Sequence, residues 1–219
     1  MLVLEPEALI GRLSRILCLG AHADDIEIGC GGTVMKLLQM GGGRISVDWV
    51  VLSAPGRRSV EANRGAETFL REAKNARVVI EDFRMSYFPY VGAEIKDRFE
   101  ILSKEVAPDL VLTHNRDDLH QDHRLVGELT WNTFRDHLIL EYEIPKYDGD
   151  LGRPNVYVHL DRETSRLKVG SLLEIFESQR EKPWFSEDVF MAMMRLRGME
   201  SRSPTGCAEA FYCRKLVLA

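Results

Sequence analysis

The segment GAHADDIEIGCGG, residues 20–32, places a histidine and three carboxylates directly behind an apolar run. These residues are His22, Asp24, Asp25 and Glu27. Carboxylates this close repel one another unless a positive charge lies among them. A metal ion, a substrate cation or water alone could relieve this repulsion. Because His22 and Asp25 are three residues apart, one tight turn can aim both side chains at the same point.

A second polar cluster, THNRDDLHQDHR, spans residues 113–124 and contains three of the six histidines of the chain. Neutral imidazole and carboxylate both suit zinc, and a catalytic zinc usually has three protein ligands and one open position. His123 would complete a His-Asp-His set with His22 and Asp25. The two clusters together therefore predict one metal site for Zn²⁺, which would also accept Fe²⁺ or Co²⁺.

Further residues in the two clusters have the chemistry of catalytic groups. Asp24 cannot easily share the ligand side with its neighbour Asp25, so it is left free beside the metal as a general base. His120 could stabilise a developing oxyanion or protonate a leaving amine. Asp122 could hydrogen-bond one of the histidines and fix its tautomer. The simpler alternative is that Asp24 or Asp25 only caps the helix that starts near Gly31.

Both clusters follow predicted strands. Strand-like and helical segments alternate along the first part of the chain, which predicts β-α-β units and a mostly parallel sheet. The predicted strands cover residues 15–22, 44–53, 77–83 and 108–114, and the predicted helices cover residues 31–43, 60–76 and 94–107. Ligands of such sheets bind beyond the carboxyl ends of the strands, so the two clusters should converge at one edge.

The regular alternation fades after residue 140. The remaining pattern predicts a strand, a long loop and a strand over 138–160, helices over 171–184 and 186–200, and a final strand over 208–218. We therefore expect an α/β fold: a Rossmann-like three-layer sandwich with a mostly parallel sheet and an elaborated C-terminal third. Tyr142, Lys146 and Tyr147 belong to a polar-aromatic loop that either shapes specificity or is plain surface.

Length and composition narrow the class of protein. The 219 residues fit a single domain over residues 1–219. A net charge of −5 gives no support for nucleic-acid binding. The fingerprint G-x-G-x-x-G is absent and carboxylates precede the glycines, which excludes a dinucleotide site. With no apolar run of roughly 18 residues, no signal-peptide pattern and no C-x-x-C spacing, we expect a cytoplasmic protein with free thiols and no membrane span.

The pattern AHADD-x-E-x-G-x-G-G, followed by H-x-D-H-R, resembles the PIG-L/LmbE family of zinc-dependent N-acetyl amino-sugar deacetylases. The resemblance implies a Rossmann-like fold. It also implies zinc on His22, Asp25 and His123, a general base at Asp24, and stabilisation of the tetrahedral intermediate by His120. Asp122 matches the acid inside the second motif.

Weaker similarities extend along the chain. RGAE, residues 64–67, is similar to the family's Arg-x-x-Glu, which implies that Arg64 faces the sugar and binds substrate. SQ at 178–179 and AEAF at 208–211 resemble the family's C-terminal segments. Many members carry proline where this chain has Ala23 or Gln121. Neither position supplies a catalytic or ligand group, so the absence of proline does not affect the expected metal site. It indicates a subgroup of the family whose substrate the sequence does not identify.

The implied activity is removal of an acetyl group from an N-acetylglucosamine-type sugar or its conjugate, through a metal-activated water. The expected partner is a small-molecule amino sugar. The sequence is compatible with a homo-oligomer as well as with a monomer. One alternative is another metal-dependent hydrolase, a phosphoesterase or non-sugar amidase, with Asp117, Asp118 and His114 as ligands of a second metal. The other is a catalytically silent sugar- or zinc-binding protein, which has no need for the unliganded Asp24.

Overall fold

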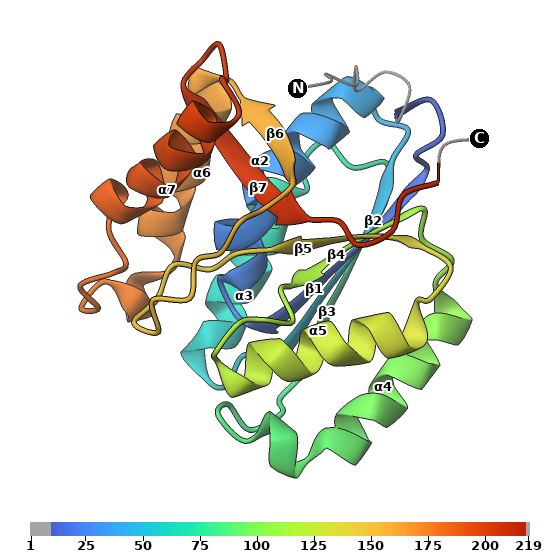
Figure 1. The fold of residues 1–219 in the computed structure, drawn as a ribbon. Coiled ribbons are helices and arrows are strands. Elements are labelled where there is room, and N and C mark those ends of the chain that lie inside the picture. Colours follow the sequence, from blue (N-terminus) through green and yellow to red (C-terminus); the bar gives the residue numbers. More distant parts are fainter. Residues whose placement is uncertain (1–9, 218–219) are drawn as a thin grey trace.

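The computed structural model describes residues 10–217, which form a seven-stranded sheet with helices on both faces (Figure 1). The strands lie in the order β3-β2-β1-β4-β5-β7-β6. They are β1 (Arg15–His22), β2 (Ser46–Ser53), β3 (Ala76–Ile80), β4 (Leu110–His114), β5 (Leu138–Tyr142), β6 (Val156–Leu160) and β7 (Cys207–Tyr212). The helices are α2 (Asp25–Gly41), α3 (Arg57–Phe69), α4 (Gly92–Glu105), α5 (Gln121–Thr133), α6 (Arg162–Ile175) and α7 (Glu187–Glu200), with short 3-10 helices η1 (Phe88–Tyr90) and η2 (Glu177–Gln179). This is the Rossmann-like α/β sandwich that the sequence predicts.

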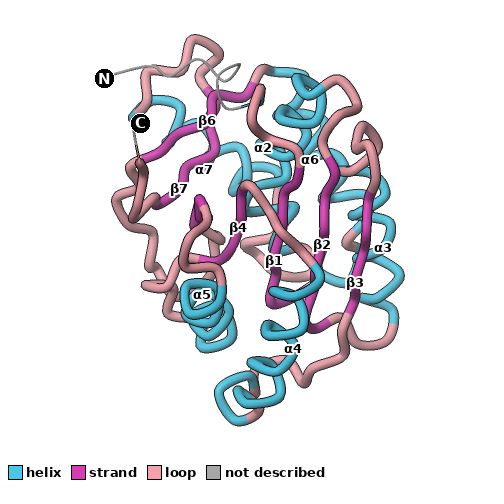
Figure 2. The backbone as a smooth tube through the Cα atoms, turned by 90° about the vertical axis from the view of Figure 1, so that its right-hand side faces the viewer, coloured by secondary structure: helices cyan, strands magenta, loops and turns pink. Residues whose placement is uncertain are grey.

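Strand β1 is apolar from residue 16 to residue 21 because both of its faces are covered. It pairs in parallel with β2 on one side and with β4 on the other. Successive side chains of a strand point to opposite faces. Ile16 accordingly packs in the core beneath α2 and α3, whereas Leu17 packs in the core beneath α4 and α5. Figure 2 shows α4 and α5 on one side of the sheet and α2, α3 and α6 on the other.

The sheet brings the ends of β1 and β4 together. The chain runs from β1 to β2 and β3 on one side and then returns to β4 on the other, so the strand order reverses between β1 and β4. Such a switch point leaves a crevice beyond the carboxyl ends of the strands. His22 ends β1 and His114 ends β4. Both polar clusters therefore start at the same crevice.

Helix α2 starts closer to β1 than the sequence indicates, at Asp25 instead of residue 31. A small residue lets it lie close to the sheet: a β-carbon on Gly29 would stand 2.2 Å from the ring of Tyr142. The Tyr142 hydroxyl donates to the Leu19 carbonyl at 2.6 Å. Tyr142 is thus fully buried and packs between α2 and β1, so it is not a residue of an open specificity loop.

The second half departs most from the prediction. The sequence pattern does not indicate helix α5, because the first turn of this helix consists of polar site residues. The helix expected over 171–184 lies instead at Arg162–Ile175, where the Asp161 side chain accepts from the Thr164 N–H and caps its start. Strand β7 runs antiparallel to both β5 and β6. None of the helices described between residues 10 and 217 combines the length and the apolar character that a membrane span needs.

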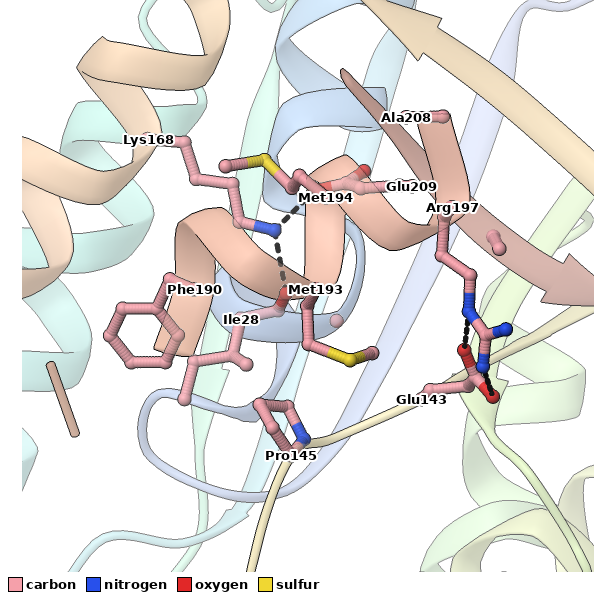
Figure 3. Close-up of a pocket in the computed structure, with 12 residues that line it drawn as sticks. Ile28, Glu143, Pro145, Lys168, Phe190, Met193, Met194, Arg197, Ala208 and Glu209 are labelled. Carbon is pink, nitrogen blue, oxygen red and sulfur yellow. Dashed lines mark hydrogen bonds and ion pairs between the residues drawn. The ribbon is translucent and has the colours of Figure 1, made fainter. Parts of the chain in front are cut away.

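Two buried ion pairs lie in the C-terminal part of the fold, and they line one small cavity of about 30 Å³ (Figure 3). In the first, Lys168 Nζ lies 2.5 Å from Glu209 Oε1 and also donates to the Ile28 carbonyl. In the second, Arg197 holds Glu143 through Nε and Nη2 at 2.9 and 2.8 Å. The cavity is too small for a sugar, so it is not the substrate site.

Candidate metal centre and active site

The three predicted metal ligands meet at one point. His22 Nδ1 lies 3.4 Å from Asp25 Oδ2 and 3.2 Å from His123 Nε2, and the last two atoms are 3.5 Å apart. Ligands around a tetrahedral ion at 2.0–2.1 Å stand about 3.3 Å from one another. All three side chains are buried. The triangle of ligand atoms therefore has the size that a divalent metal such as zinc requires.

Two carboxylates fix the orientation of the histidines. Asp122 Oδ2 lies 2.9 Å from His22 Nε2, and Asp118 Oδ2 lies 3.0 Å from His123 Nδ1. Each histidine thus donates its outer N–H to a carboxylate, and its inner nitrogen faces the triangle. Two inner lone pairs at 3.2 Å repel unless a cation lies between them. Metal-free protein needs a proton there, and a metal ion can replace it.

The electrostatics of the triangle agree with this picture. Burial would lower the pKa of His22, but Asp25 and Asp122 outweigh burial and raise the pKa to about 9. Burial and the nearby His114 lower the pKa of His123 to about 4. Burial would raise the pKa of Asp25, yet the surrounding histidines hold it well below its usual value. In the metal-free protein, His22 therefore carries the positive charge among these residues.

Asp24 is buried beside the triangle but has a different partner. It occupies the N-cap position of α2 with a left-handed backbone (φ 94°), but its side chain makes no capping hydrogen bond. Its Oδ1 accepts from Arg58 Nη2 at 2.7 Å, and the same nitrogen donates to the Ala23 carbonyl. Burial raises the pKa of Asp24 to about 7, against the opposing effect of Arg58. Such a group can exchange a proton near neutral pH.

His120 lies at the exposed side of the cluster, with its ring centroid 4.4 Å from that of His123. Its Nδ1 accepts from the Asp122 N–H at 3.2 Å, so the proton of the neutral ring is on Nε2. Burial and nearby His22 lower the pKa of His120 below its ordinary value. Neutral His120 thus presents one N–H donor.

Besides the triangle, two other groups of described side chains have atoms close enough to hold an ion: His22 with His120 and His123, and Asp25 with His114 and His123. In the second group, His114 stands at the end of β4. However, its Nε2 already accepts from the Ala21 N–H at 3.0 Å, and its ring stacks on His123 with centroids 4.1 Å apart. Asp118 is held between His123 and Lys146 Nζ, which is 3.0 Å away. These contacts leave few free ligands for the two-metal alternative.

Arg64, the expected substrate-binding arginine, forms no hydrogen bond or ion pair with the triangle or with Asp24 in the described part of the chain. The Arg64 side chain is 49% exposed, and its ionic neighbour, at 3.9 Å, is Glu174 on α6. The same Arg-x-x-Glu spacing occurs six residues earlier, in RSVE at 58–61. There Arg58 contacts Asp24, and Glu61 accepts from the N–H and hydroxyl of Ser178 at 2.8 and 2.5 Å. The start of α3 follows the end of β2, so only its first turn reaches the crevice.

Sequence reasoning also missed the loop between β3 and α4. Ser86 and Phe88 donate their backbone N–H groups to the two oxygens of Asp122 at 2.6 and 3.2 Å. These backbone contacts carry no side-chain signature that a sequence pattern could reveal.

Comparison with known proteins places this geometry in a family. The profile of PIG-L, described as GlcNAc-PI de-N-acetylase, matches residues 17–134, which include both clusters and more than half of the chain. The chain belongs to the PIG-L family. It is also 27% identical over 146 residues to the uncharacterized deacetylase YaiS of Escherichia coli K12, a match that covers 59% of this chain and 74% of YaiS.

Solved structures share the fold of this PIG-L family chain. The N,N'-diacetylchitobiose deacetylase of Pyrococcus horikoshii is 20% identical, with a TM-score of 0.68 over 95% of this chain and 86% of that one. GalB of Pseudomonas putida KT2440, a 4-carboxy-2-hydroxymuconate hydratase, is 15% identical, with a TM-score of 0.72 over 94% and 98%. The fold therefore accommodates more than one reaction, and the reaction of this chain has to be inferred from the side chains of its site.

Proposed function

We propose that this protein is a metal-dependent hydrolase that removes the acetyl group from an N-acetylated amino sugar of the N-acetylglucosamine type or from its conjugate. The observation that carries the proposal is the triangle of His22, Asp25 and His123 with an unliganded carboxylate, Asp24, beside it. The family description as a de-N-acetylase and the deacetylase name of YaiS support the same reaction.

His22, Asp25 and His123 would hold the metal, and two imidazoles with one carboxylate favour zinc over calcium or magnesium. Fe²⁺ and Co²⁺ are also compatible with this donor set. A bound ion would polarise the amide carbonyl and increase the acidity of a nearby water. Asp122 and Asp118 would keep the two imidazoles oriented for this role.

The chain's own residues would carry the protons. Asp24 takes a proton from the attacking water, for which its pKa of about 7 is well matched. The N–H on His120 Nε2 donates to the oxygen of the acetyl group as negative charge develops there. Asp24, which now carries the proton from the water, then donates it to the departing amine as the C–N bond breaks. Arg58, and not Arg64, is the arginine that would bind the substrate beside Asp24.

The test is acetate release from a panel of N-acetylglucosamine conjugates by zinc-loaded and chelator-treated protein. We expect release only with metal, and one zinc per chain. The panel includes an N-acetylated amino acid and a phosphate monoester, so that a non-sugar amidase or a phosphoesterase would be recognised. Zinc bound at one per chain with no acetate released from any sugar conjugate would refute the proposal and favour a silent binding protein.

His120→Ala should lower kcat by about 10²–10³-fold, the usual loss when one oxyanion donor is removed. Its metal content should not change, because His120 is outside the triangle. His123→Ala, in contrast, should lose both metal and activity. His159→Ala on β6 is the matched histidine control, with wild-type turnover expected. Full turnover by His120→Ala at equal metal content would show that this role is wrong.

A further inference from the structure

Large apolar side chains are exposed beside the candidate active site. Met85, Tyr87 and Tyr90 lie in the loop between β3 and α4, and Leu119 directly precedes His120; their exposures are 41%, 41%, 77% and 58%. We call these four residues the apolar rim. Single exposed apolar residues are normal on a protein surface. Four of them beside one polar cluster form an uncommon arrangement.

The loop part of the rim is tied directly to the cluster. Asp122, which holds His22, also accepts both loop N–H groups, from Ser86 and Phe88. Gln121 Nε2 donates to the Ser86 carbonyl at 2.5 Å. The Phe88 ring centroid lies 5.8 Å from that of His22. The carboxylate that orients a metal ligand therefore also fixes the loop.

The loop buries Phe88 in the core and leaves the side chains around Ser86 in solvent. Ser86 has a left-handed backbone (φ 66°), which a non-glycine residue adopts only at some cost. With this backbone, the two residues that flank Ser86, Met85 and Tyr87, are exposed to solvent. Arg84 lies 3.5 Å above the Tyr87 ring centroid, and the Tyr87 and Tyr90 rings are 5.9 Å apart, so the aromatic surface is preorganised.

The rim borders the reacting groups from two sides. Met85 Sδ lies 3.7 Å from Arg58 Nη1, and Arg58 contacts the proposed base Asp24. On the other side, Leu119 is the neighbour of His120, and its N–H is fixed by Asp150 Oδ2 at 2.8 Å. A substrate with its amide between Asp24 and His120 would extend over these side chains.

We propose that the apolar rim binds an apolar aglycone, an alkyl or aryl group attached to the N-acetylated sugar. This inference rests on the proposed function and specifies its substrate. A free sugar offers mostly hydroxyl groups and would leave the rim in water. An alkyl or aryl aglycone would cover it, and each buried methylene group strengthens binding severalfold.

The test compares kcat/KM for the methyl and octyl glycosides of N-acetylglucosamine, the latter below its micelle concentration, with the disaccharide N,N'-diacetylchitobiose. We expect the octyl glycoside to exceed the methyl glycoside by about tenfold or more, mainly through a lower KM. Leu119→Ala and Tyr87→Ala should each reduce this octyl-to-methyl ratio by about threefold or more. Leu167→Ala on α6, where the leucine is 51% exposed, is the matched control and should keep the wild-type ratio.

The outcomes separate the two proposals. Equal kcat/KM for methyl and octyl glycosides would overturn the rim as an aglycone site and leave the deacetylase function intact. A preference for the disaccharide over the octyl glycoside would assign the rim to a second sugar and also overturn the inference. Acetate release from none of the three compounds would overturn the proposed function and, with it, the inference.

Discussion

Asp24→Asn should lower kcat by about 10²–10⁴-fold, the contribution expected of a general base, while the metal content stays unchanged. Asparagine has the same shape, tolerates the left-handed backbone at this position (φ 94°) and still accepts from Arg58. It cannot accept the proton of water at its carbonyl oxygen to any useful extent. Steady-state kinetics and metal analysis on the same sample measure both effects.

The pH dependence gives a second measure of the same residue. Asp24 acts as a base only when it is deprotonated, so kcat/KM should fall as the pH drops below its pKa of about 7. A cation bound beside Asp24 favours the ionised carboxylate, so the fall in kcat/KM shifts to lower pH. The residual kcat/KM of Asp24→Asn should not show this fall at low pH.

Asp117→Asn is the control for this substitution, because Asp117 is exposed and lies in the second cluster. We expect it to keep wild-type turnover, whereas a two-metal site that uses Asp117 predicts a loss. An Asp24→Asn protein that retains more than about a tenth of the wild-type kcat would exclude Asp24 as the general base.

Lys168→Met should reduce the free energy of unfolding by about 3–5 kcal/mol, since it leaves Glu209 buried without its counter-charge. For a chain of this length, that loss lowers Tm by about 6–20 °C. Thermal unfolding followed by circular dichroism measures the change. The double variant Lys168→Met/Glu209→Gln should be less destabilised than the sum of the two single variants, because it removes both charges together.

Lys96→Met provides the comparison for an exposed ion pair. Lys96 lies 2.5 Å from Glu100 on the same helix, with both side chains partly in solvent. Such pairs contribute about 0–1 kcal/mol. If Lys96→Met and Lys168→Met cost the same, burial does not determine the strength of the Lys168–Glu209 pair.

Much of the site could be predicted because it follows from sheet topology. The boundaries of β1 at residues 15 and 22 agree with the apolar run. The approach of His22 to His123 follows from the rule that parallel strands end at a common edge. The spacing of His22 and Asp25 places both ligands on one turn. These features depend on the local sequence pattern and on one general rule of sheet topology, so they can be predicted from one sequence.

Other parts depend on contacts that no local pattern encodes. Arg58 and Arg64 both stand in an Arg-x-x-Glu segment, and only the position of α3 relative to β2 distinguishes them. Asp118 contacts both His123 and Lys146, and Lys146 belongs to a loop distant in sequence. Helix α5 was missed because its first turn consists of site residues. The antiparallel insertion of β7 between β5 and β6 is a pairing of distant segments.

The place of Glu209 has a consequence for how the chain acquires its structure. The Glu209 carboxylate accepts the N–H groups of Gly32 and Thr33, at 2.9 and 2.6 Å, across 177 and 176 residues of sequence. Contacts over such separations form late, because the loop between them must first close. A nascent chain that has emerged from the ribosome only as far as α6 therefore has Lys168 without its counter-ion. The contacts that fasten the middle of α2 to β7 can therefore form only after β7 has joined the sheet.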